Sequence, residues 1–167
     1  MSTAETLSTW SNLGYVGAAV AVLLLDPGGG SAVVAVSLLL LAGGSWWMHG
    51  RQDYGLAETL DHAGMHATLM SLATLSVGAP WWLAAVGAGA AALVLERTLN
   101  VRVEPAMGVY LWFVGAGALV AGELTTFLLG LGCMGLGFAA WHREGDAWHA
   151  AWHVLTSVGL VFLYLAT

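Results

Sequence analysis

Long stretches without any charged residue constrain the fold of this chain more than any other feature of its sequence. Residues 31–50 contain no Asp, Glu, Lys or Arg, and neither do residues 62–95. Because a helix needs about 20 mostly apolar residues to cross the hydrocarbon core of a bilayer, such runs are long enough to form membrane spans. Of the 167 residues, 59% are hydrophobic and only 8% are charged, and the mean hydropathy is +0.79. These values are typical of an integral membrane protein.

Charged residues, glycines and prolines divide the chain into seven expected helices. Their ranges are 11–25, 31–50, 57–77, 80–95, 105–121, 124–141 and 147–166. No charge separates the third range from the fourth, so we expect "VGAP" at Val77–Pro80 to form a turn, with Gly78 and Pro80 as helix breakers. The regular alternation of a transmembrane β-barrel is absent. The sequence therefore predicts an all-α polytopic membrane protein, a seven-transmembrane-helix bundle that forms a single domain over residues 1–167.

The distribution of positive charge predicts how this bundle is oriented. Its four basic residues, Arg51, Arg97, Arg102 and Arg143, follow the second, fourth and sixth expected helices, and the opposite loops contain no Lys or Arg. Since positive residues favour the cytoplasmic side, we expect a cytoplasmic amino terminus and a carboxyl terminus outside. The amino terminus lacks the basic region of a cleaved signal peptide, so we expect the first helix to be retained.

Polar residues from three of the expected helices should meet near the cytoplasmic surface. Ser45 and His49 in "SWWMH" are four residues apart and share one helical face at the end of the second helix. Asp61 lies in the first turns of the third helix, which starts from the same side. The seventh helix starts there too, and in "HAAWH" it carries His149 and His153, again four residues apart. Polar groups in membrane spans are costly to bury, so these five residues are candidates for a functional site.

The three histidines of this group fit the chemistry of a metal site. Two histidines at i and i+4 can bind one ion from a single helix, and a third from a facing helix gives three protein ligands with one open position. Neutral imidazole suits Zn²⁺, and this layout is typical of catalytic zinc. We therefore predict His49, His149 and His153 as metal ligands. Asp61 is then placed to accept a proton from water, and Ser45 to stabilise a developing oxyanion.

At these residues the sequence resembles a known group of membrane proteins. "SWWMH", "LDHAG" and "HAAWH" are similar, in order and helix position, to the motifs of the CREST superfamily of seven-helix membrane proteins, which includes alkaline ceramidases and the progestin and adiponectin receptor (PAQR) and hemolysin III group. The resemblance implies zinc at His49, His149 and His153, with Asp61 and Ser45 beside it. "LDHAG" and the expected cytoplasmic amino terminus look more like the PAQR and hemolysin III branch.

Two functions are compatible with such a site. The first is a zinc-dependent intramembrane hydrolase that acts on a membrane lipid amide or ester, with Asp61 and Ser45 as catalytic residues. The second is a non-catalytic seven-helix protein whose zinc ion has a structural or sensing role. Bis-histidine haem and a copper site that uses methionine (Met48, Met65 or Met134) also stay open. A rhodopsin is excluded because the chain contains no lysine to form a retinal Schiff base.

The remaining conspicuous residues predict less. His62 and His66 face about 100° away from Asp61 on an ideal helix, and we expect hydrogen-bonded roles rather than a second metal site. Trp46, Trp47 and Trp152 lie close to the predicted ligands and would either shape an acyl-chain pocket or simply pack. Glycine-rich faces permit close helix contacts within one chain or in a homo-oligomer. No basic cluster suggests nucleic acid as a partner.

Overall fold

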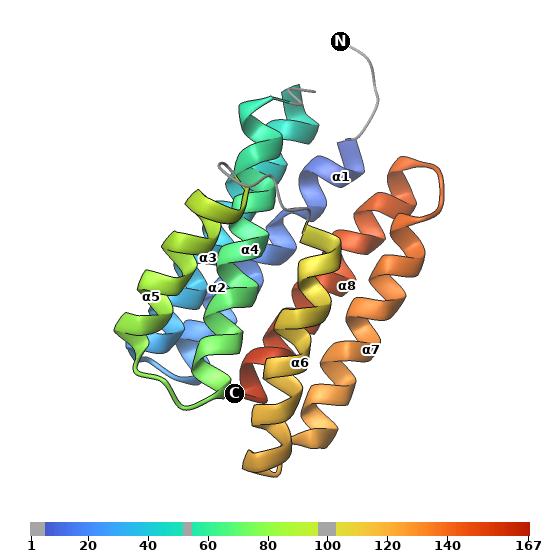
Figure 1. Ribbon diagram of the computed structural model, residues 1–167. Helices are drawn as coiled ribbons and strands as arrows, with labels where there is room; N and C mark the ends of the chain where they lie inside the picture. The colour runs from blue at the N-terminus through green and yellow to red at the C-terminus, as the bar shows by residue number, and fades with distance from the viewer. Residues whose placement is uncertain (1–5, 52–54, 97–102) are drawn as a thin grey trace.

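The computed structural model describes residues 6–51, 55–96 and 103–167 of the chain, and within these ranges all regular secondary structure is helical. The helices are α1 (Thr6–Ser11), α2 (Leu13–Leu25), α3 (Gly29–Arg51), α4 (Leu56–Ser76), α5 (Trp81–Ala90), the π-helical turn η1 (Ala91–Glu96), α6 (Val103–Ala121), α7 (Leu124–Trp141) and α8 (Asp146–Leu165). Only Asn12 separates α1 from α2, and α5 runs directly into η1. The described chain therefore forms seven helical rods (Figure 1).

The seven rods follow the predicted ranges closely, and the all-α prediction is confirmed. The largest difference is at the start, where the first rod begins at Thr6 instead of residue 11. The polar stretch before Ser11 carries no apolar run, so hydropathy gave no reason to extend the helix. Two of the arginines that predicted the orientation, Arg97 and Arg102, lie outside the described residues.

The predicted turn at "VGAP" is confirmed. Helix α4 ends at Ser76, Gly78 adopts a left-handed φ of 73°, and Pro80 lies directly before the first residue of α5. Glycine tolerates this φ without the steric cost that a Cβ would add, and proline cannot continue the preceding helix. Gly145, with a φ of 111°, has the corresponding role between α7 and α8.

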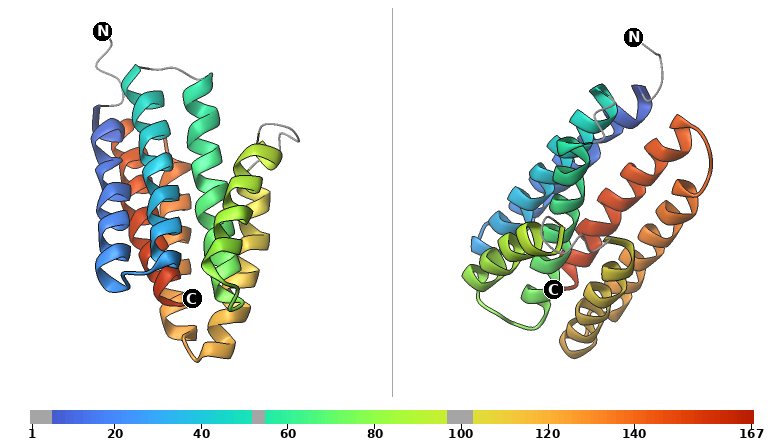
Figure 2. Two further views of the ribbon diagram at one scale, coloured as in Figure 1. Left: turned by 90° about the vertical axis from the view of Figure 1, so that its left-hand side faces the viewer. Right: turned by 45° about the horizontal axis from the view of Figure 1, so that its top comes forward.

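Six of the rods form a closed ring, and the seventh lies outside it. Helix α2 packs against α3 and α8, α3 against α4, α4 against α6, and α7 against α6 and α8. The α5–η1 rod packs on the outer side of α4 and α3 (Figure 2). Successive rods run in opposite directions, so the two ends of the chain lie at opposite ends of the bundle (Figure 1).

Helices α3 and α4 approach one another closely because two glycines lie at their interface. A Cβ on Gly44 would be 2.4 Å from the backbone nitrogen of Asp61, and a Cβ on Gly64 would be 2.5 Å from the Cα of Leu41. Small residues allow this kind of close backbone contact between helices in lipid. The contact at Gly44 holds the end of α3 against the first turns of α4, which is where the predicted site residues lie.

The outer surface of the ring is apolar, as expected for a protein in a bilayer. Large apolar side chains such as Leu24 (79% exposed), Val36 (67%) and Val120 (90%) point away from the core. Four rods are long and apolar enough to cross a membrane, namely Thr6–Leu25, Gly29–Arg51, Leu124–Trp141 and Asp146–Leu165. Helix α4 is less apolar, and it packs against α3, α5 and α6 with its polar residues His66, Thr68 and Ser71 buried. These features support a membrane protein.

Candidate metal centre

The three predicted histidine ligands come together in the structure. His49 lies in the last turn of α3, and His149 and His153 lie in the first two turns of α8. Each residue offers a ring nitrogen, and these nitrogens all lie within 4.8 Å of one another. Among the described residues, this is the one group of three or more His, Cys, Asp or Glu residues with such a spacing. Three imidazole nitrogens at this distance can hold a metal ion.

The rings of the cluster pack directly on one another inside the protein. Ring centroids are 4.5 Å apart for His49 and His149, 5.2 Å for His49 and His153, and 4.8 Å for His149 and His153. His49 is 4% exposed and His153 is 3% exposed, whereas His149 is half-buried. The cluster therefore lies just below the protein surface, near the end of the bundle where the chain begins.

Asp61 and Ser45 lie beside the histidines, as predicted. The Ser45 Oγ is 3.5 Å from Nε2 of His153, and the Asp61 side chain lies near Ser45. Asp61 is also close enough to His49 for the two side chains to interact electrostatically. The close contact at Gly44 explains this arrangement, because it places the α3 backbone against the backbone of Asp61. The carboxylate does not belong to the group of metal-binding nitrogens, so it is available for hydrogen bonding or proton transfer.

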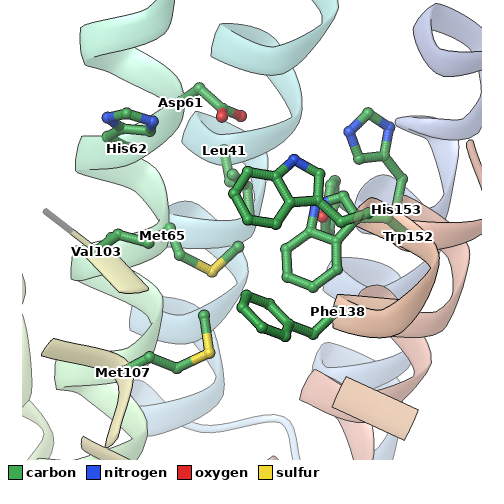
Figure 3. A pocket seen from close by; sticks show the side chains of 11 residues that line it. Leu41, Asp61, His62, Met65, Val103, Met107, Phe138, Trp152 and His153 are labelled. Atoms are coloured by element: carbon green, nitrogen blue, oxygen red, sulfur yellow. The ribbon is translucent and has the colours of Figure 1, made fainter. Parts of the chain in front are cut away.

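A cavity of about 80 Å³ adjoins the cluster inside the ring of helices. Every helix of the ring contributes to its wall, which is formed by Tyr15, Leu41, Asp61, His62, Met65, Val103, Met107, Phe138, Trp141, Trp152 and His153. Figure 3 shows the Asp61 carboxylate and the His153 ring on opposite sides of this space, with Met65, Met107 and Phe138 along its apolar side. One end of the cavity is thus polar and carries the predicted site residues, and the other end is apolar.

The tryptophans divide between this cavity and the outer surface. Trp152 lines the cavity together with Trp141, and the two ring centroids are 6.3 Å apart. Trp46 packs edge-on against Trp10 at 5.0 Å and, with Trp47, borders a separate surface hollow. Of the three tryptophans considered for an acyl-chain pocket, Trp152 is therefore the one that lines the cavity beside the histidines.

The other histidines have separate environments. His66 is fully buried, and its Nδ1 is 3.1 Å from the hydroxyl of Tyr110 on α6, so it links two helices. His62 borders the same cavity as Asp61, although it leaves α4 in a different direction (Figure 3). His142 lies at the end of α7, where its ring stacks edge-on against Phe138 at 4.5 Å. The contact of His66 with Tyr110 agrees with the hydrogen-bonded role expected for His66.

Sequence reasoning missed the contribution of the first six-residue helix to this centre. Nδ1 of His153 is 2.8 Å from the Ser11 hydroxyl and 3.1 Å from the Ser8 carbonyl oxygen, both on α1. Asp146, one residue before the predicted start of the last helix, hydrogen-bonds the beginning of α1. The serines were a weak signal because hydroxyl groups are common at helix ends.

Comparisons with known proteins give no family assignment for this chain. No family model, no curated protein and no solved structure matches its sequence or fold.

Proposed function

We propose that this protein is a zinc-dependent intramembrane hydrolase that cleaves the amide or ester bond of a membrane lipid. One observation carries the proposal: three imidazole nitrogens lie within 4.8 Å of one another, next to a carboxylate and a cavity inside an apolar helical bundle. Three-histidine sites with an open fourth position are typical of catalytic zinc.

The donor set supports zinc as the metal. All three donors are imidazole nitrogens, a donor type that suits Zn²⁺, and the carboxylate beside them is not one of the three. A zinc ion held by His49, His149 and His153 supplies a Lewis acid that polarises a carbonyl group and acidifies water. The copper alternative would require a methionine, and Met65 borders the same cavity, so the metal must be identified by measurement.

Asp61 and Ser45 have distinct tasks in the proposed reaction. A water molecule attacks the carbonyl carbon of the lipid, and Asp61 accepts the proton that this water loses. Asp61 then returns the proton to the departing amine or alcohol, so the products are a free fatty acid and that amine or alcohol. Ser45 donates a hydrogen bond to the carbonyl oxygen as negative charge develops on it. Both side chains lie close enough to the cluster to act on one carbonyl group.

The shape of the cavity supports a lipid as the substrate. Its polar end carries Asp61 and His153, and its far side is formed by Met107 and Phe138. The last two side chains also border a hollow of about 250 Å³ between α6 and α7. An acyl chain fits an apolar surface of this kind, whereas the carbonyl group belongs at the polar end.

The proposal includes membership of the CREST superfamily and the orientation that the arginines predict. The support is the order and helix position of the "SWWMH", "LDHAG" and "HAAWH" motifs, together with seven antiparallel helical rods. A bundle that crosses the bilayer seven times with a cytoplasmic amino terminus would place the histidine cluster near the cytoplasmic surface.

The test of the metal site is the metal content of the purified protein, prepared without chelators and analysed by mass spectrometry. We expect about one zinc ion per chain in the wild type and none in His49→Ala or His149→Ala, because two imidazoles no longer hold the ion tightly. His142→Ala is the matched control, since it removes a histidine at the same end of the bundle that lies outside the cluster. Equal metal content in all four proteins, or none in any, contradicts the proposal.

A non-catalytic zinc site is the second candidate, and the donor geometry supports it equally. Such an ion would tie α3 to α8 through His49 and the two α8 histidines. Zinc-loaded protein that hydrolyses no ceramide, acyl amide or lysolipid, and that unfolds when the metal is removed, would favour this structural role over the hydrolase.

A further inference from the structure

The backbone carbonyl of Ser8 on α1 is an unusual hydrogen-bond acceptor. Three donors surround it: the Ser11 hydroxyl at 2.8 Å, the Asn12 side-chain amide at 3.0 Å and Nδ1 of His153 at 3.1 Å. Ser8 and Asn12 are both completely buried. A carbonyl in a dry environment has no water to satisfy it, so these contacts fix α1 and the His153 ring relative to each other.

These contacts determine which nitrogen of His153 carries its hydrogen. A carbonyl oxygen can only accept, so Nδ1 must be the donor toward Ser8. The Ser11 hydroxyl gives its own hydrogen to the same carbonyl, and its oxygen then accepts from Nδ1 at 2.8 Å. A neutral imidazole has one N–H, so the lone pair is on Nε2, the atom that lies 3.5 Å from Ser45. Nε2 is therefore the nitrogen that is able to bind a metal ion.

Asp146 holds α1 in the position that these contacts require. Its carboxylate accepts hydrogen bonds from the backbone N–H groups of Leu7 and Ser8, each at 2.8 Å, and from the Ser8 hydroxyl. Asp146 is the first residue of α8, three residues before His149. The same carboxylate thus ties the beginning of α1 to the turn of α8 that carries the histidines.

We propose that α1 positions the His153 ring of the histidine cluster. Ser11 and the Ser8 carbonyl hold the Nδ1–H tautomer of His153, and Asp146 holds α1 against α8. Ser11 and Asp146 are positioning residues, because Ser11 acts on Nδ1 of His153 and Asp146 acts by holding α1 in place. The expected effect on metal affinity rests on the proposed function. The tautomer of His153 is independent of whether a metal binds. Hydrogen bonds to the second nitrogen of a ligating histidine typically change metal affinity 10- to 100-fold.

The tautomer is tested first, on the metal-free wild-type protein, by NMR of ¹⁵N-labelled histidine. The spectrum of the neutral His153 ring, assigned by its loss in His153→Gln, is expected to show a protonated Nδ1 and an unprotonated Nε2. A protonated Nε2 overturns the proposal. This measurement needs no bound metal, so it separates the present inference from the proposed function: if the wild type binds no zinc, the hydrolase proposal fails and the tautomer result still stands.

The effect on metal binding is tested with Ser11→Ala, Ser11→Thr and the control Ser71→Ala. Zinc dissociation constants are measured by competition with a chelator of known affinity, after chromatography has shown that each variant is monodisperse. We expect zinc to bind about tenfold more weakly to Ser11→Ala, the lower end of the usual range, because the Ser8 carbonyl remains as an acceptor. Ser11→Thr keeps the hydroxyl and should bind as the wild type does.

Ser71 is a matched control because its buried hydroxyl bonds to the carbonyl of Ala67 on its own helix, away from the cluster. If Ser11 had only a structural role, Ser71→Ala would weaken zinc binding as much as Ser11→Ala does, and Ser11→Thr would not restore it. Equal affinity in Ser11→Ala and the wild type also overturns the proposal.

Discussion

At the scale of single residues, the carboxylate of Asp61 is the group on which the proposed chemistry depends most. It is the acidic side chain that lines the cavity, and it is not one of the groups whose atoms could together hold a metal ion. A general base must lie near the reacting water and must be able to release its proton again, and a carboxylate in this position meets both conditions.

Replacement of Asp61 by asparagine should separate catalysis from metal binding. Asn has nearly the same shape as Asp and stays polar, but it cannot accept a proton from water. We expect lipid hydrolysis by Asp61→Asn to fall by about 10²–10⁴-fold while the zinc content stays that of the wild type. The measurement is a kinetic assay in detergent micelles on the lipid that the wild type cleaves. Glu58→Gln, one turn earlier on α4, is the control and should retain activity; equal losses in both variants contradict the role of Asp61.

Residue patterns predicted the histidine cluster because the relevant geometry is local. His149 and His153 share a face by helical periodicity alone, and His49 reaches them because antiparallel helices return to the same end of the bundle. The Ser8 and Ser11 contacts were not predictable in this way. They join residues more than 140 positions apart, and the sequence around a serine near a helix end does not show which distant residue it will contact.

At the scale of the helices, the contact between α3 and α4 is what joins the histidine cluster to Asp61. The three histidines come from α3 and α8, whereas the carboxylate comes from α4. Gly44 and Gly64 allow the α3 and α4 backbones to touch, so small shifts between these helices change the distance from His49 to Asp61. Well-packed helix pairs in lipid gain stability from such close contacts.

Substitution at Gly44 tests the importance of this contact. In Gly44→Ala the added Cβ would lie 2.4 Å from the Asp61 backbone nitrogen, so the two helices must move apart. We expect a loss of about 1–3 kcal/mol in stability, the usual cost of overpacking, together with weaker zinc binding. The measurement is the midpoint of unfolding by denaturing detergent, followed by helical circular dichroism.

Gly43→Ala is the matched control for this substitution. It makes the same change one residue earlier on the same helix, where an added Cβ meets no atom within 4 Å. Because both variants gain the same helix propensity, the difference between them isolates the contact with α4. If Gly44→Ala were as stable as Gly43→Ala, the close contact between α3 and α4 at Gly44 would not stabilise the protein.

At the scale of the whole molecule, the structure is a ring of six helical rods with a seventh packed outside. The cavity is inside the ring, and the outer surface carries exposed apolar side chains over its length. Seven antiparallel rods place the two ends of the chain at opposite ends of the bundle (Figure 1). If every rod crosses the bilayer, the termini lie on opposite sides of the membrane.

Cysteine labelling in intact cells tests this arrangement. In a Cys133→Ser background, which removes the native free cysteine, single cysteines replace Thr167 at the carboxyl end and Glu144 between α7 and α8. Both residues are exposed, so both can react with a membrane-impermeant maleimide. We expect Thr167→Cys to be labelled in intact cells and Glu144→Cys only after lysis, because Arg143 favours the cytoplasmic side for its loop. The reverse result contradicts the orientation, and labelling of both from outside contradicts a membrane crossing by α8.

The sequence by itself determined the helices, their approximate bounds and the meeting of His49, His149 and His153. Hydropathy, helix breakers and helical periodicity are local properties, and short turns force neighbouring helices to run antiparallel. Only the tertiary structure decided that α5 lies outside the ring, that α1 packs on α8, and that Nδ1 of His153 contacts Ser8 and Ser11. These features depend on which surfaces of distant helices fit together, through side-chain volume, glycine contacts and buried hydrogen bonds. No stretch of the sequence encodes such a fit alone.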